Sequence, residues 1–164
     1  MTENRCNTVL VAYSAVPKIA KAYDLAFKMR LKSSFMSAHL KKGVSTLSLV
    51  EEMLEINRRK HLLFLLRSSV ENALAAIPQK YRELLILRFL DNKTFQEAAM
   101  IQNISVRTAF RRFDRAREEL SRALDREGLT DKIFKELYLD DPYIAAACGA
   151  YCADTYFTAK SRRT

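Results

Sequence analysis

Arginine is concentrated in one stretch of the chain, between Arg107 and Arg117. A planar guanidinium group can donate two hydrogen bonds at once to the O6 and N7 acceptors of guanine, and it also binds phosphate. If one helix carried these side chains outward, they could read or hold duplex DNA. The stretch contains five of them: Arg107, Arg111, Arg112, Arg115 and Arg117.

The same stretch has an apolar face at helical spacing. Ala109, Phe113, Ala116 and Leu120 recur every three or four residues, so a helix here would bury one side and leave the arginines on the other. Ser105 lies where it can cap the first free amides of that helix. The pattern therefore predicts a cationic helix that begins after Ser105.

A short helix and a tight turn are predicted just before it. Thr94 and Glu97 have the spacing of a capping box, which fixes the start of the first helix. Ala98 and Ala99 are small enough for a second helix to approach closely, and Asn103 tolerates the left-handed conformation that ends a helix. In this order, the features predict a helix-turn-helix.

In such a motif the N-terminal part of the second helix meets base edges, while flanking groups hold phosphates. An arginine-rich face that is merely solvated remains the alternative interpretation of this helix taken alone. The predicted base-reading residues are Val106, Arg107, Phe110 and Arg111. The predicted phosphate contacts are Thr94, Ser105, Thr108, Arg112, Arg115 and Arg117.

The elements that position this motif are predicted to be helical throughout. Only three Gly and three Pro interrupt 164 residues, and strong helix formers dominate, so the expected fold is all-α. We predict a long N-terminal helical hairpin in residues 1–75, a helix-turn-helix domain in residues 76–125, and a short helix with a tail in residues 126–164. The short helix is expected to begin at Asp131, after Gly128 closes the preceding one.

The predicted hairpin consists of two amphipathic helices. The first is expected to take Pro17 in its first turn, and the residues 41–43 (Lys-Lys-Gly) indicate a break. The second, from about Ser45, with Ser45 or Ser48 as cap, to about Leu74, carries an apolar stripe that requires a partner helix. That partner is the first helix, a second copy of the chain bound through residues 46–75, or another protein.

From Ala76 to Leu120 the chain resembles region 4 of the bacterial sigma-70 family of RNA polymerase sigma factors. The resemblance is carried by Ile77-Pro78, by the segment from Tyr81 to Phe89, by Thr94 to Ala99, by Ile104 to Val106, and by Arg115 to Arg117. It implies a DNA-binding module of transcription initiation that also contacts RNA polymerase core. Residues 1–75 lack the pattern of a promoter-melting region, so the chain is similar to short sigma-like regulators of Gram-positive bacteria and their phages.

Charge and composition restrict the remaining classes. A net charge of +9 favours a polyanionic partner, and double-stranded DNA is the one predicted. No apolar run long enough to span a membrane and no secretion signal is evident, which predicts a cytoplasmic protein without a membrane partner. Cys6, Cys148 and Cys152 lie far in sequence from His39 and His61, so we expect no metal and no cofactor. No constellation of catalytic residues is evident either, and we do not expect an enzyme.

Two other functions remain open on the sequence. One is a phage packaging or recombination protein that docks on DNA and oligomerises through its N-terminal helices. The other is an adaptor that binds polymerase without reading DNA. The leading prediction is a sequence-specific DNA-binding transcription regulator of sigma-like type.

Overall fold

A computed structural model describes residues 2–39 and 46–160, with side chains placed for residues 5–36 and 46–151. Over these ranges the chain is helical and has no strand, as predicted. The helices are α1 (Thr2–His39), α2 (Thr46–Ala76), α3 (Gln79–Phe89), α4 (Phe95–Ile101), α5 (Val106–Arg126), α6 (Asp131–Leu137) and α7 (Pro142–Lys160).

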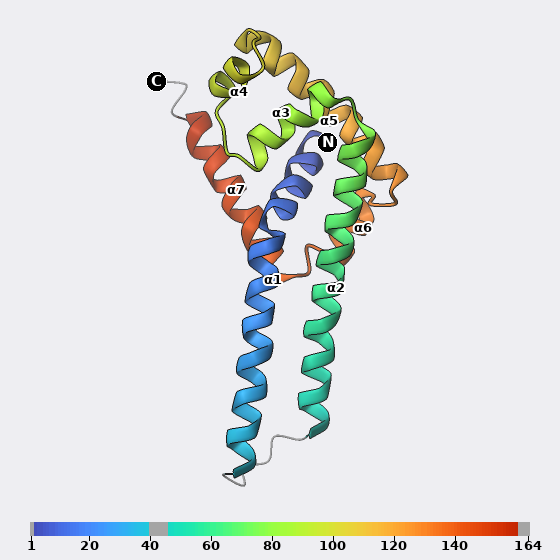
Figure 1. Ribbon diagram of the computed structural model, residues 1–164, viewed down its shortest axis with the longest axis vertical. Helices are drawn as coiled ribbons and strands as arrows, with labels where there is room; N and C mark the ends of the chain where they lie inside the picture. The colour runs from blue at the N-terminus through green and yellow to red at the C-terminus, as the bar shows by residue number, and fades with distance from the viewer. Residues whose placement is uncertain (1, 40–45, 161–164) are drawn as a thin grey trace.

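The two longest helices, α1 and α2, run antiparallel side by side and extend well beyond the rest of the molecule (Figure 1). Their contact buries Ile19 and Tyr23 of α1 and Leu63, Leu66 and Val70 of α2. The prediction that these helices pack on each other within one chain is confirmed. The predicted break at residues 41–43 and the predicted cap at Ser45 lie outside the described residues.

Two predictions for this hairpin are wrong. Pro17 does not lie in a first helical turn, because α1 begins at Thr2 and carries Pro17 in its interior. A proline there removes one backbone hydrogen bond and disturbs the preceding turn. The apolar residues before it, Val9, Leu10, Ala12 and Val16, are buried, and this burial keeps the helix continuous. Ser48 is not a cap, since α2 begins before it, at Thr46.

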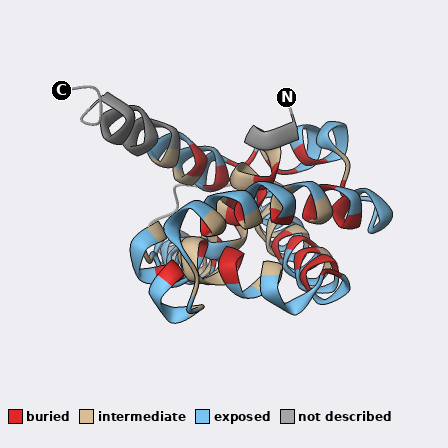
Figure 2. Cartoon of the chain, turned by 90° about the horizontal axis from the view of Figure 1, so that it is seen from above, coloured by how far each residue is buried: buried red, intermediate tan, exposed pale blue. Residues whose placement is uncertain are grey.

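One continuous core joins the hairpin to the helices that follow. Buried side chains from α1, α2, α3, α5 and α6 belong to a single cluster that includes Leu10, Leu66, Leu84, Leu120 and Phe134. At its edge, Arg5 Nη1 lies 2.8 Å from Asp125 Oδ1, and Cys6 Sγ donates to the carbonyl oxygen of Arg117 at 3.2 Å. Figure 2 shows the buried positions on the sides of the helices that face one another. The start of α1 therefore supports α5 directly.

The C-terminal part contains a second helix, α7, beyond the short one that the sequence predicts. α6 ends at Leu137, and Asp141 starts α7, because its Oδ1 accepts from the amides of Tyr143 at 2.9 Å and Ile144 at 3.1 Å. Pro142 follows as the first helical residue, a position that suits its fixed backbone angle. α7 packs against α1.

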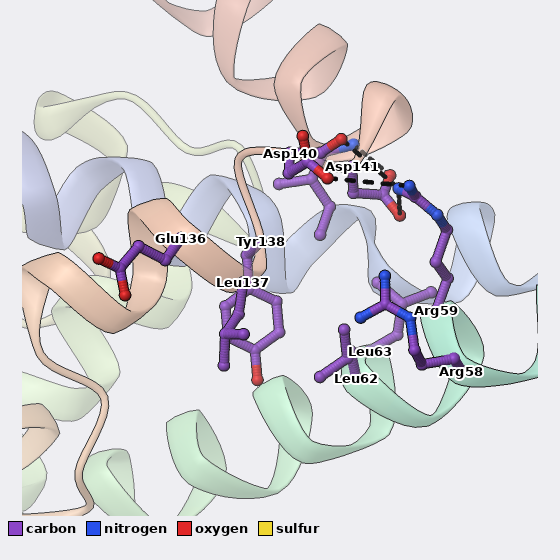
Figure 3. Close-up of a pocket in the computed structure, with 10 residues that line it drawn as sticks. Arg58, Arg59, Leu62, Leu63, Glu136, Leu137, Tyr138, Asp140 and Asp141 are labelled. Atoms are coloured by element: carbon purple, nitrogen blue, oxygen red, sulfur yellow. Dashed lines mark hydrogen bonds and ion pairs between the residues drawn. The ribbon is translucent and has the colours of Figure 1, made fainter. Parts of the chain in front are cut away.

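A buried polar cluster ties α7 to the hairpin. The Tyr23 hydroxyl of α1 donates to Asp141 Oδ2. Arg59 Nη1 of α2 lies 3.6 Å from the same carboxylate (Figure 3). Burial, followed by the hydrogen bond to Asp141, raises the pKa of Tyr23. Tyr23 therefore stays a neutral donor, and Asp141 is held by three elements of the fold.

Candidate nucleic-acid interface

The start of α4 is fixed by the predicted capping box. Thr94 Oγ1 accepts from the Glu97 amide at 3.2 Å, and the Thr94 amide donates to Glu97 Oε2 at 2.7 Å. Hydrogen bonds from the Thr94 backbone and side chain hold the pKa of Glu97 below its usual value. The two free amides at the start of α4 are thereby satisfied, which sets its direction.

The turn between α4 and α5 depends on Asn103. This residue has φ of 56°, the left-handed conformation that the sequence predicts for it. The Ile104 amide donates to Ala99 at 2.9 Å and the Asn103 amide to Met100 at 3.1 Å, which is the hydrogen-bond pattern of a Schellman motif. Ala98 and Ala99 are fully or nearly fully buried, so the two helices approach closely beside the turn.

Ser105 caps α5 as predicted, since its Oγ accepts from the Thr108 amide at 3.2 Å. We expect Ser105→Ala to lower the free energy of unfolding by about 1 kcal/mol, which lowers the melting temperature by about 2–4 °C for a chain of this size. Ser105→Asp keeps the capping oxygen and is expected to melt like the parent, while its negative charge weakens DNA binding. Circular dichroism melts test this, and equal melting of the alanine variant would contradict the role of the cap.

The faces of α5 are divided as the sequence predicts. Ala109, Phe113, Ala116 and Leu120 are buried and pack α5 on the rest of the domain. On the opposite side, Arg107, Arg111 and Arg115 are exposed and follow one another at i, i+4 and i+8. Asp114 and Glu118 share this outward side, so the cationic surface lies over the first half of α5.

The arginines of α5 fall into two groups. Among the described side chains, no hydrogen bond or ion pair engages Arg107, Arg111, Arg112 or Arg115. Arg117 differs, because its Nη2 lies 2.6 Å from Asp114 Oδ1 and its guanidinium group lies 4.9 Å from the Phe113 ring centroid. Only 14% of the Arg117 side chain is exposed. Arg117 is therefore part of the packing of α5, and we leave it out of the proposed DNA contacts.

The two apolar candidates lie at the edge of the arginine face. Val106 and Phe110 are 38% and 40% exposed. The Phe110 ring packs on the Phe95 ring, and the two ring centroids are 4.1 Å apart. The guanidinium carbon of Arg88 lies 4.4 Å from the centroid of the Phe95 ring. Phe110 therefore has a fixed orientation and only part of its ring is free for a base. Sequence reasoning missed this support from Phe95 and Arg88, which only the tertiary contact reveals.

The remaining phosphate candidates lie on either side of α5. Thr94 and Ser105 are exposed at the starts of the two helices. At Thr94 the Glu97 carboxylate already accepts from the backbone amide, so only the start of α5, at Ser105, offers amides and a helix dipole that favour an anion. Thr108 is half-buried, and its hydroxyl lies 2.8 Å from that of Ser105. Arg112 lies on the side of α5 opposite Phe110, where it lines a groove. The other residues that line this groove are Lys80, Glu83, Ile86, Leu87, Ile101 and Gln102.

A short helix, a tight turn and a longer cationic helix are the arrangement of a DNA-binding helix-turn-helix. The family model for sigma-70 region 4 matches residues 67–120, about a third of the chain. This part of the chain is therefore a sigma-70 region 4-type helix-turn-helix, a DNA-binding module of transcription. The match begins inside α2, before the start predicted at Ala76. Comparisons with curated proteins and with solved structures found no match.

Cysteines, possible metal ligands and long apolar helices among the described residues would indicate other classes of site. Cys6 and Cys148 are buried, and the side chain of Cys152 is not described. Within the described part, no three His, Cys, Asp or Glu side chains are arranged to hold a metal ion. No helix there is long and apolar enough to cross a membrane.

Proposed function

We propose that the protein is a sequence-specific double-stranded DNA-binding regulator of sigma-like type, which acts with RNA polymerase in transcription initiation. One observation carries the DNA contact: Arg107, Arg111 and Arg115 form an exposed row on the second helix of the motif, and none of them has an ion pair with a described carboxylate. A row of this kind matches the position from which such helices enter the major groove.

The electrostatics of α5 support this proposal. Like charges at i, i+4 repel each other, so this row lowers the stability of the free protein. A bound polyanion neutralises the charges and relieves the repulsion. Three other exposed arginines have an ion pair: Arg58 with Glu55, Arg67 with Glu71, and Arg122 with Glu119. The contrast with these arginines favours a binding role for the unpaired row.

The polymerase contact rests on the sigma-like region and on a groove beside α5. The groove has a volume of about 440 Å³, and Ile86, Leu87 and Ile101 contribute apolar lining. Gln102 Nε2 donates to the carbonyl oxygen of Lys80 at 3.3 Å at the edge of this groove. An apolar segment of the polymerase would fit there while α5 faces DNA.

Selection of bound sequences from random duplex DNA, with and without core polymerase, tests the proposal. We expect enrichment of a defined sequence, and stronger enrichment when polymerase is present. Binding of polymerase with no enrichment and no salt-sensitive DNA complex would instead support the adaptor that does not read DNA. Absence of both interactions would contradict the proposal altogether.

Arg115→Ala is expected to weaken binding to all duplex sequences by a similar factor, because this residue faces phosphate. The slope of log K against log salt concentration should fall in magnitude by about one. Fluorescence anisotropy titrations at several salt concentrations measure both effects. Lys132→Ala is the matched control, since it removes the same charge from an exposed side chain of α6, and it should leave the slope unchanged. An equal slope for the Arg115 variant and the parent would exclude the phosphate contact.

A further inference from the structure

The helix α2 has a second apolar stripe that faces solvent. Its inner side packs on α1 and the body, where Leu63, Leu66 and Val70 are buried. Its outer side exposes Leu47, Val50, Leu54 and Phe64 by 68%, 46%, 63% and 68%. Four large apolar side chains aligned on one exposed helix face indicate an interaction surface.

The outer stripe has the spacing of a coiled-coil seam. Its positions are separated alternately by three and four residues, the repeat at which two helices keep one face in contact. The polar members, Asn57 and His61, lie in its second half, and both are exposed. The full seam is Leu47, Val50, Leu54, Asn57, His61 and Phe64.

This seam is complementary to itself when one of two copies is reversed. About a point between Glu55 and Ile56, Leu47 of one copy faces Phe64 of the other, Val50 faces His61, and Leu54 faces Asn57. In this arrangement every polar member lies opposite an apolar one. A two-fold axis through that point therefore generates the same contact twice, as a closed dimer requires.

The charges on α2 favour the same antiparallel orientation. Its first half carries Glu51, Glu52 and Glu55, and its second half carries Arg58, Arg59 and Lys60. Antiparallel pairing places the acidic half of each copy beside the basic half of the other, whereas parallel pairing places like charges together. Glu51 and Arg58 flank the seam on the same side, and Arg58 already pairs with Glu55 of its own helix at 2.7 Å. In the dimer, Glu51 of each copy can join this ion pair of the other copy, and two such contacts are symmetric.

The outer face of α1 differs in charge. It exposes Leu25, Met29 and Met36, but Lys18, Lys21, Lys28 and Lys32 lie on the same side. Among the described residues, none of these lysines has an ion pair. Two copies of this face would repel each other, so α1 does not offer a self-complementary surface.

We propose that α2 forms an antiparallel homodimer through the seam from Leu47 to Phe64. Figure 1 shows the N-terminal part of α2 extending away from the body, so a second hairpin can approach it there. From Arg58 to Leu63 the helix also lines a pocket with residues of α6 and α7. With a rise of 1.5 Å per residue, Ala76 lies about 31 Å from the two-fold axis. The Ala76 ends of the two α2 helices are then roughly 60 Å apart along the bundle.

Analytical ultracentrifugation across the micromolar range tests the dimer with the full chain and without DNA. We expect a reversible monomer–dimer equilibrium, and Leu54→Glu should raise its dissociation constant by roughly tenfold or more, because the change occurs twice at the centre of the seam. Leu54 is exposed in the free chain, so the variant should keep the circular dichroism and melting temperature of the parent. A parent that remains monomeric throughout would overturn the proposal.

Two further sets of variants test the face and the orientation. Leu25→Glu makes the same change at a 59% exposed leucine of α1, and it should leave the dissociation constant unchanged. A similar loss with Leu25→Glu, or growth beyond dimers, would indicate head-to-tail contact of α1 with α2 and overturn the two-fold arrangement.

Glu51→Arg and Arg58→Glu should each weaken the dimer, and the double variant should recover most of the loss. Failure of this recovery would exclude the antiparallel register. All these outcomes are independent of DNA binding, so they separate this proposal from the proposed function.

Discussion

Replacing Arg111 with alanine is expected to weaken binding to the selected duplex by about 1–3 kcal/mol, which is a roughly 5- to 150-fold rise in Kd. Arg111 lies on the outward face of α5, one turn after Arg107, and no described side chain of the protein engages it. A guanidinium group in this position can present both donors to the O6 and N7 of a guanine. Binding to unselected DNA should fall much less, since only one charge is lost.

Two control variants separate base reading from charge. Arg111→Lys keeps the charge but loses the two-pronged donor, so it should lose discrimination between selected and unselected DNA while retaining binding to both. Arg122→Ala removes a charge from the same helix at a residue that already pairs with Glu119 at 3.1 Å. It should change neither the discrimination between selected and unselected DNA nor the affinity for the two duplexes. Anisotropy titrations with the two duplexes give the discrimination ratio. If Arg111→Ala keeps the ratio of the parent, base reading by this residue is excluded.

Leu10→Ala is expected to lower the free energy of unfolding by about 2–5 kcal/mol, the usual cost of truncating a leucine in a packed core. Leu10 is fully buried, and it belongs to the same core cluster as Leu84 of α3 and Leu120 of α5. The cavity should therefore destabilise the helix-turn-helix as well as the hairpin. Urea unfolding measured by circular dichroism gives the loss, and hydrogen exchange of α5 amides shows whether it reaches the motif.

The matched control is Leu25→Ala, the same change in the same helix at a side chain that is 59% exposed. It should alter the free energy of unfolding by no more than about 0.5 kcal/mol. If Leu10→Ala speeds exchange only within α1 and leaves α5 protected, the hairpin and the helix-turn-helix unfold as separate units. The predicted boundary between residues 75 and 76 would then be a thermodynamic boundary as well.

Local features of the motif could be predicted because their causes lie within a few residues. The capping box of Thr94 and Glu97, the left-handed Asn103 and the Ser105 cap each depend on backbone groups of the same turn. The buried face of α5 follows from helical periodicity alone. The placement of Pro17 could not be predicted in this way, because whether a helix continues through a proline depends on the burial of the residues before it.

The sequence by itself determined the helical class, the helix-turn-helix and its outward row of arginines, since periodicity and capping act over one or two turns. Only the tertiary structure decided which arginines remain available, because Arg117 is held by Asp114 and packed on Phe113, whereas Arg107, Arg111 and Arg115 point away from the core. It also decided that α1 supports α5, through Arg5 and Cys6, and that α2 keeps an uncovered apolar face. These properties depend on residues that are distant in sequence, and only packing brings such residues together.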